Sequence, residues 1–234
     1  MEDLIENRVI DKPLSRIQKL IGQRMSLSKR TKPCFYLKAK ADITDLMAMR
    51  PKLRKTFNVK ITTNTFYIYI LAQAVKRYPL SVGLYKDDKI KIAPAANIGF
   101  AVNAPHGLVV PVIKNAHLKS LAEIAEQEKI LTEKARDNQL ILEEIEGETI
   151  ALSNLGVYGI DSFFAIIPPP ASSILSVGNV IREALPKNGR LQVRKTVNLA
   201  VVADRMVVNE FYAAEFLNFI KENLQNPQKL ISVD

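Results

Sequence analysis

The sequence predicts an α/β fold in which helices and strands alternate over one mixed sheet. Apolar residues recur at helical spacing in several stretches, most clearly in residues 120–138, whose other face carries Glu and Lys. Stretches with strand patterning lie between them, and residues 34–41 alternate between apolar and polar side chains. Because the two patterns interleave along the whole chain, we expect helices packed on a single sheet.

The first half of the chain supplies three of the expected helices. Residues 1–12 read as the end of a linker, and a helix over residues 15–29 precedes the strand at 34–41. Asp42 can cap the helix that follows, with Asp45 in its positive first turn, and this helix runs to about Phe57. Thr63 or Asn64 opens the next helix, which ends before Pro79.

The second half is richer in strands. The last helix is expected from Asn209, a good N-cap residue, to about Leu224. The helix at 120–138 is the other one expected here. The strands are expected near residues 89–92, 97–102, 108–113, 149–154, 162–167, 173–179, 190–195 and 197–203.

Composition limits the function classes. The 234 residues suit one large domain or two small ones, and 47% hydrophobic content is typical of a globular protein. Cys34 is the only cysteine, so no internal disulfide can form, and a small apolar residue in a strand is its simplest role. No apolar run reaches membrane-spanning length, and the acidic start argues against a signal peptide. The net charge of +9 is scattered without a nucleic-acid motif, so we expect neither nucleic-acid nor membrane binding.

Residues 201–217 carry the most informative motif. They read as a strand running into an amphipathic helix, with Asp204, Arg205 and Asn209 at the junction. This segment resembles the C-terminal active-site motif of the dihydrolipoamide acyltransferases, the E2 cores of 2-oxo acid dehydrogenase complexes, which usually reads Asp-His-Arg-x-x-Asp-Gly. Arg205 then stands in place of the catalytic His, Met206 in place of Arg, and Glu210 in place of Gly.

Further blocks support the resemblance in order and spacing over roughly residues 12–229. Residues 147–159 resemble a Gly-Gly-Thr-Phe-Thr-Ile-Ser-Asn-Leu-Gly block, and residues 97–113 resemble a block ending in Gly-Leu-Val-Val-Pro-Val. Residues 15–25 match the basic opening helix, and residues 31–36 the strand start after it. The resemblance implies a chloramphenicol-acetyltransferase-like two-layer sandwich, with residues 13–234 as the core domain. It also implies a trimer, or multiples of it, with active sites between subunits.

The family moves an acyl group between a dihydrolipoyl thiol and coenzyme A, and this chemistry implies three site residues. A base forms the thiolate, and a hydrogen-bond donor stabilises the oxyanion. The resemblance places the oxyanion donor at Ser153, the base position at Arg205 and its polar neighbour at Asn209. A turn-shaping serine and a helix-capping asparagine are the alternative roles. Arg205 cannot be a base because its guanidinium stays protonated.

The two histidines do not replace the missing base in this interpretation. His106 lies in an expected turn and His117 before an expected helix, so solvent-facing positions are the simplest reading of both. Other departures from the family pattern point the same way: Val202 replaces a serine, and residues 168–171 read Pro-Pro-Pro-Ala instead of Asn-Pro-Pro-Gln.

Three functions remain open from the sequence. The chain is a catalytically impaired core that acts as a scaffold, an acyltransferase with altered chemistry, or a module that binds coenzyme A without transferring acyl groups. Expected partners are further copies of the chain, active E2 subunits, E1 and E3 enzymes, and lipoyl domains, with the lipoyl group on a separate domain. Coenzyme A is the expected substrate, and no metal is expected. The expected location is the cytoplasm for a prokaryotic protein and the mitochondrial matrix for a eukaryotic one.

Overall fold

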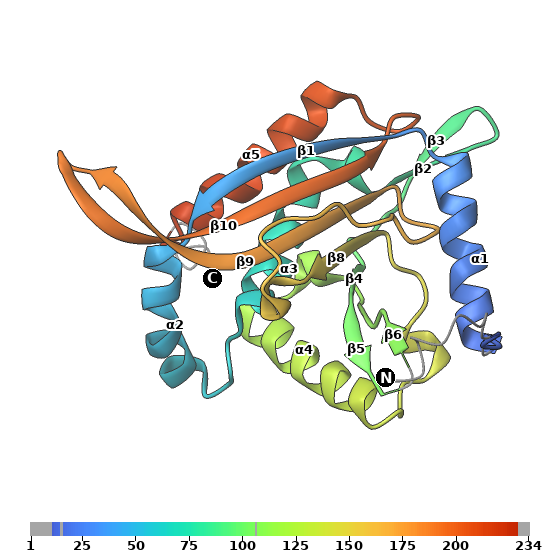
Figure 1. Ribbon diagram of the computed structural model, residues 1–234, viewed down its shortest axis with the longest axis horizontal. Helices are drawn as coiled ribbons and strands as arrows, with labels where there is room; N and C mark the ends of the chain where they lie inside the picture. The colour runs from blue at the N-terminus through green and yellow to red at the C-terminus, as the bar shows by residue number, and fades with distance from the viewer. Residues whose placement is uncertain (1–10, 15, 106, 229–234) are drawn as a thin grey trace.

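A mixed six-stranded sheet organises the protein in a computed structural model that describes residues 11–14, 16–105 and 107–228 (Figure 1). In order across the sheet, the strands are β1 (Cys34–Asp42), β10 (Arg190–Asp204), β9 (Ser173–Lys187), β8 (Ile150–Asn154), β4 (Ile98–Phe100) and β7 (Val112–Ile113). The pairs β4–β8 and β8–β9 are parallel, and the other neighbouring pairs are antiparallel. This confirms the expected mixed sheet.

Four helices cover one face of this sheet and build the main core with it: α2 (Thr44–Phe57), α3 (Thr63–Arg77), α4 (Leu121–Arg136) and α5 (Glu210–Gln225). α3 is the most enclosed of them, because residues 65–72 of this helix are all buried. Its neighbours α4 and α5 contribute apolar stripes that include Ile124 and Phe216. The remaining helix, α1 (Arg16–Thr31), lies on the other side, where its Ser28 hydroxyl donates to the Ile167 carbonyl oxygen.

Short elements complete the chain. Two small hairpins stand beside the main sheet, and single 3₁₀ turns join the larger elements. The hairpins are β2 (Gly83–Lys86) with β3 (Lys89–Ile92), and β5 (Val102–Ala104) with β6 (Gly107–Val109). The 3₁₀ turns are η2 (Pro79–Val82), η3 (Ala116–Leu118), η4 (Leu142–Glu144) and η5 (Gly156–Tyr158).

Local capping chemistry sets the helix starts close to where the sequence places them. Thr62 and Ser120 each form a reciprocal capping box at the start of α3 and α4. The Asp42 carboxylate accepts the amide of Thr44, the first residue of α2, at 3.0 Å. The N-cap residue is nevertheless Ile43, one residue later than expected. Buried Glu128 of α4 accepts hydrogen bonds from the Thr62 and Thr65 hydroxyls, and its pKa is raised mainly by burial. These bonds tie α4 to the start of α3.

One strand prediction is wrong, and three others correspond to two longer strands. Residues 162–167 form no strand, although their side chains alternate between exposed and covered. The alternation arises because the segment lies along the sheet, where its Ala165 amide bonds the Ser176 hydroxyl instead of a strand partner. The three strands expected over residues 173–203 are two long strands, β9 and β10, whose hairpin projects beyond the body (Figure 1). A register shift at Asn198 interrupts the pattern in β10.

The sheet face opposite α3 and α5, called the open face below, is covered by residues 160–167 and by the end of α1, whose Ser28 hydroxyl donates to the Ile167 carbonyl oxygen. Residue alternation in β8 defines it: Ile150 and Leu152 enter the main core, whereas Ala151 enters a small second cluster on the other side. Tyr36 and Phe164 meet edge to face on the open face with 46% and 50% of their surfaces exposed. By contrast, residues 171–178, which follow this segment in the chain, are buried.

Candidate active site

The turn between β10 and α5 holds two of the three expected site residues. The strand ends at Asp204, whose carboxylate accepts the Met206 amide at 3.0 Å and so shapes the turn. Asn209 follows as the N-cap of α5 and accepts the Tyr212 amide at 2.8 Å. The expected strand–turn–helix junction is therefore confirmed, and Asp204 and Asn209 each stabilise it by accepting a backbone amide.

Arg205 lies on the surface of this turn and is paired with Glu210. Its Nε donates to Glu210 Oε1 at 3.0 Å, and the two side chains are 53% and 57% exposed. The Arg205 amide donates to the Pro33 carbonyl oxygen at 3.1 Å, which fixes the backbone next to the start of β1. Arg205 thus makes an ion pair within its own chain, with one of the acidic residues that flank it.

Arg205→Ala is expected to change stability by about 0.5 kcal/mol or less, because exposed ion pairs contribute little. The Pro33 contact uses the backbone and survives the substitution. Thermal denaturation at a fixed protomer concentration measures the effect, with Glu210→Ala as the matched control because it removes the other half of the same pair. A loss of several degrees in Arg205→Ala alone would show that Arg205 has a partner beyond Glu210.

Ser153 occupies the end of β8 on the open face. It is half-buried, and within the part of the chain that the structure describes its hydroxyl has no hydrogen-bond partner. The residue after it is firmly held: Asn154 donates to Asn64 of α3 and accepts the Gly156 amide, each at 2.9 Å. The serine therefore presents a free hydroxyl from a rigid strand end.

The structure does not bring Ser153 and Arg205 together within one chain. Ser153 pairs with Ser176 of β9, which pairs with Ala200 of β10, five residues before Arg205. Two strand spacings and this offset along the strand put the two positions about 19 Å apart. A side-chain hydroxyl and a base that act on the same reacting atom must each lie within hydrogen-bond reach of it. One chain alone therefore cannot form a site from both positions.

Beneath the 205 turn lies a buried charged group that the sequence did not reveal. Asp204 and Glu148 are each only 5% exposed, and burial raises the pKa of both carboxyls. Lys32 lies near them, donates to the Ala171 carbonyl oxygen, and has a pKa lowered by burial. The one available signal was Glu148, which stands where the family block has its second glycine.

Cys34, at the start of β1, adjoins this group and is unsuited to act as a nucleophile. Burial, and then the nearby Asp204 charge, raise the pKa of its thiol, so the thiolate is disfavoured at neutral pH. The side chain is half-buried and packs against the small apolar cluster on the open face. This agrees with the simple structural role that the sequence indicates.

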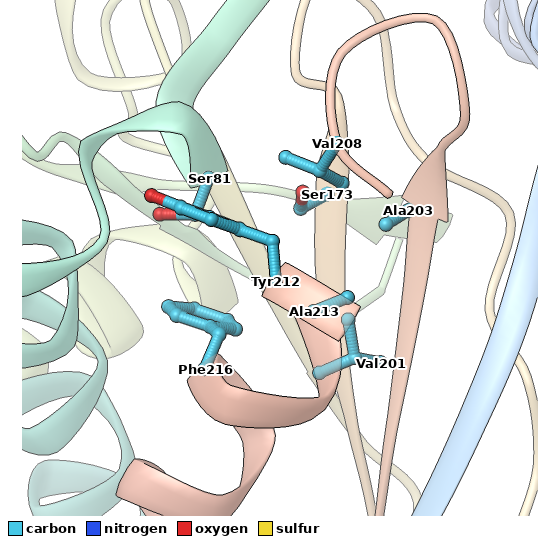
Figure 2. Close-up of a pocket in the computed structure, with 8 residues that line it drawn as sticks. All are labelled: Ser81, Ser173, Val201, Ala203, Val208, Tyr212, Ala213 and Phe216. Atoms are coloured by element: carbon cyan, nitrogen blue, oxygen red, sulfur yellow. The ribbon is translucent and has the colours of Figure 1, made fainter. Parts of the chain in front are cut away.

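A small cavity behind the turn is shown in Figure 2. Tyr212, from the first turn of α5, reaches across toward Ser81, and its hydroxyl accepts the Leu80 amide at 2.9 Å. This bond ties α5 to η2. The cavity is lined mainly by apolar atoms and is too small to hold a substrate. Its lining residues are Ser81, Ser173, Val201, Ala203, Val208, Tyr212, Ala213 and Phe216.

The histidines and acidic residues form no alternative centre in the described parts of the chain. His117 is half-buried, and its Nδ1 accepts the Ala96 amide at 3.2 Å, so the solvent-facing role expected for it is wrong. His106 lies outside the described residues. Within residues 11–14, 16–105 and 107–228, no three His, Cys, Asp or Glu side chains gather closely enough to hold a metal ion. None of the helices in these ranges is long and apolar enough to cross a membrane.

Sequence comparisons place this chain among known proteins. A family model described as 2-oxoacid dehydrogenases acyltransferase (catalytic domain) matches residues 6–232. The chain is 35% identical to the dihydrolipoyllysine-residue acetyltransferase component of the pyruvate dehydrogenase complex of Rickettsia bellii, over 94% of this chain and 53% of that protein. It is also 35% identical to the mitochondrial pyruvate dehydrogenase protein X component of Mus musculus, over 93% and 44% respectively. The chain thus spans about half the length of these curated relatives.

Solved structures agree with the sequence comparisons. The Azotobacter vinelandii dihydrolipoamide acetyltransferase superposes with a TM-score of 0.91 at 25% identity, covering 99% of this chain and 97% of that one. The cubic core of a pyruvate dehydrogenase multienzyme complex gives 0.91 at 26% identity with the same coverage. Chloramphenicol acetyltransferase matches in fold alone, with 0.52 at 10% identity over 93% and 99% of the two chains. The expected chloramphenicol-acetyltransferase-like fold is confirmed, and the chain belongs to the catalytic-domain family of the 2-oxoacid dehydrogenase acyltransferases.

Proposed function

We propose that this chain is a catalytically impaired E2-type acyltransferase core that acts as an oligomeric scaffold in a 2-oxo acid dehydrogenase complex. The proposal depends on Arg205, which we assign to the position of the base and whose Nε donates to Glu210 at 3.0 Å. A guanidinium cannot accept a proton from a thiol at physiological pH. The substrates would be coenzyme A and a dihydrolipoyl group carried on a separate domain.

The spacing of the site residues supports this assignment. In the Azotobacter vinelandii enzyme, a serine, a histidine and an asparagine have roles in the catalytic mechanism. That serine and histidine are separated by the same number of residues as Ser153 and Arg205. The histidine and asparagine there are separated by the same number as Arg205 and Asn209. We therefore assign the oxyanion donor to Ser153, the abandoned base position to Arg205 and its polar neighbour to Asn209.

The transfer reaction defines what this chain has lost. A base takes the proton from the attacking thiol, the thiolate attacks the thioester carbonyl, and a new carbon–sulfur bond forms. The Ser153 hydroxyl donates to the resulting oxyanion. When the intermediate collapses, the old carbon–sulfur bond breaks and the departing sulfur takes the proton back from the base. Without a base at position 205, the first and last proton transfers fall to water.

Several observations support the scaffold role. One 35% identical relative is named as the protein X component of a complex rather than as a transferase. Another structural relative forms a cubic core. The apolar Tyr36, Phe164 and Ile166 on the open face are suited to packing against another copy. Active E2 subunits, E1 and E3 enzymes and lipoyl domains are the proposed partners, in the cytoplasm of a prokaryote or the mitochondrial matrix of a eukaryote.

A second candidate is an active transferase with altered chemistry. The free Ser153 hydroxyl favours it, because the oxyanion donor is kept, and a few per cent of thiol is ionised near pH 7 without help. An arginine can also lower the pKa of a nearby thiol. The Glu210 carboxylate beside Arg205 weakens that effect, so the impaired scaffold is the better supported function.

Coenzyme A-dependent acyl transfer to dihydrolipoamide tests the choice directly. We expect the purified chain to be about 10²–10⁴-fold slower than the Azotobacter vinelandii core assayed alongside, because a positioned base contributes that much. Turnover equal to that of the Azotobacter core would rule out the impaired-scaffold function and favour the second candidate.

The oligomeric state is the second expected result. Analytical ultracentrifugation at micromolar protomer concentration should show a trimer or a multiple of a trimer. Phe164→Asp should shift the distribution toward smaller species, because it places a charge on the open face. Leu118→Asp is the matched control, since Leu118 is 74% exposed and lies in η3, away from this face. A stable wild-type monomer would contradict the scaffold proposal.

A further inference from the structure

The two halves of the expected site have different fates in this chain. The Ser153 half keeps a free hydroxyl on a strand end that Asn154, Asn64 and Gly156 hold in place. The 205 half has no base, and its guanidinium is paired with Glu210. The Ser153 half therefore keeps its hydrogen-bond donor, whereas the Arg205 half lacks a base.

The distance between Ser153 and Arg205 decides which sites an oligomer of this chain can form. The two positions lie about 19 Å apart, so a complete site must take one half from each of two chains. In an oligomer of identical copies, every such site joins Ser153 to Arg205 and lacks a base. In a mixed oligomer, a site that joins Ser153 of this chain to a histidine of its neighbour is complete. A site that joins a serine of the neighbour to Arg205 of this chain lacks a base and is incomplete.

We propose that this chain is a one-sided subunit that completes the active site of a histidine-bearing acyltransferase core by donating Ser153. The inference rests on the proposed function and adds the partner and the direction of the contact. The partner's imidazole takes and returns the thiol proton, while Ser153 of this chain donates to the oxyanion. Each of these two groups acts from its own chain, so no rearrangement of the Arg205–Glu210 pair is needed.

The open face supports a second acyltransferase core as the occupant. Ser153 lies on that face, and its strand partner Ser176 accepts the Ala165 amide. Within the same segment, Phe164 and Ile166 are 50% and 43% exposed, so an apolar surface adjoins the serine. Because the relatives in this family include a chain that forms a cubic core, a neighbouring core can cover this surface and bring its own 205-equivalent position to Ser153.

A complementation experiment with this chain tests the proposal. The base-restored chain carries Arg205→His, Met206→Arg and Glu210→Gly, and the base-only chain adds Ser153→Ala to these changes. The wild-type and base-only chains are given different tags, co-expressed, and purified through both tags in turn. Neither parent has a complete site. We expect the doubly tagged oligomers to transfer acetyl groups from acetyl-coenzyme A to dihydrolipoamide.

The expected activity is about one third of that of the base-restored oligomer, because a cyclic trimer of two kinds of chain has one interface in the productive direction. The matched control replaces the wild-type chain by Ser153→Ala and should be inactive. Inactive doubly tagged oligomers, or none at all, beside an active base-restored chain would overturn this inference but leave the proposed function standing. An inactive base-restored chain would also overturn this inference, because Ser153 would then not be a competent donor, but it would not contradict the impaired scaffold.

Discussion

Restoring the histidine motif is expected to raise acyl transfer by about 10²–10⁴-fold over the unmodified chain. Arg205→His supplies an imidazole whose pKa lies close to neutral pH, which suits a base for a thiol. The single change should recover only part of the rate, because the Glu210 carboxylate that pairs with Arg205 remains beside the new imidazole. The triple change with Met206→Arg and Glu210→Gly removes this competitor and should recover more.

The control for this result is Arg205→Gln, which removes the positive charge without providing a base. Its rate should stay at the level of the unmodified chain. The measurement is steady-state transfer from acetyl-coenzyme A to dihydrolipoamide, with the pH profile of kcat/KM recorded for each variant. A working imidazole introduces a titration near its own pKa, which the Gln variant lacks. An equal gain in both variants would mean that the arginine charge, and not the missing base, limits the rate.

Gly178→Ala is expected to destabilise the fold by about 3 kcal/mol, at the upper end of the usual cost of overpacking. A Cβ at this position would lie 2.7 Å from the Asp161 carbonyl carbon and still closer to its oxygen. Both are backbone atoms, so no flexible side chain can move aside. Gly156 is equally constrained, because a Cβ there would lie 2.8 Å from the Gly178 carbonyl carbon. Together these glycines allow the turn after β8 to pack directly on β9.

Urea denaturation at a fixed protomer concentration measures this effect, since oligomer stability depends on concentration. Gly22→Ala is the matched control: it makes the same chemical change within α1, where the added Cβ meets no atom within 4 Å apart from its chain neighbours and the backbone of its own helix. It should leave stability unchanged or raise it slightly, because alanine favours helix. Gly178→Ala with wild-type stability would mean that residues 159–161 can shift without loss, and the close approach would then have no energetic importance.

The sequence predicted the helices well because their signals are local. Thr62, Ser120 and Asn209 cap their helices through amides three residues further along the chain, which a sequence displays directly. The strands were harder to predict because pairing depends on distant partners. Residues 162–167 alternate like a strand, yet the neighbouring positions on the sheet are already filled by β8, β9 and β10.

The site shows the same division between local and distant information. The pairing of Arg205 with Glu210 could be expected, because five residues separate them across a turn into a helix. The buried charged group of Lys32, Glu148 and Asp204 could not be expected, because its members come from three segments that are distant in the sequence. The separation of Ser153 from Arg205 follows from the sheet order, which spacing along the chain does not reveal.

The capping role of Asn209 has a consequence for how such motifs change during evolution. Its side chain accepts the Tyr212 amide, and Asp204 likewise accepts the Met206 amide, so the start of α5 depends on both polar residues. Replacing an N-cap residue by alanine commonly costs about 1 kcal/mol, which is enough for selection on folding to retain it. Arg205 has no comparable role in its turn, so under the proposed function that position is free to vary. Under that function, the residues that build the helix are kept although the residue that performs the chemistry has been replaced.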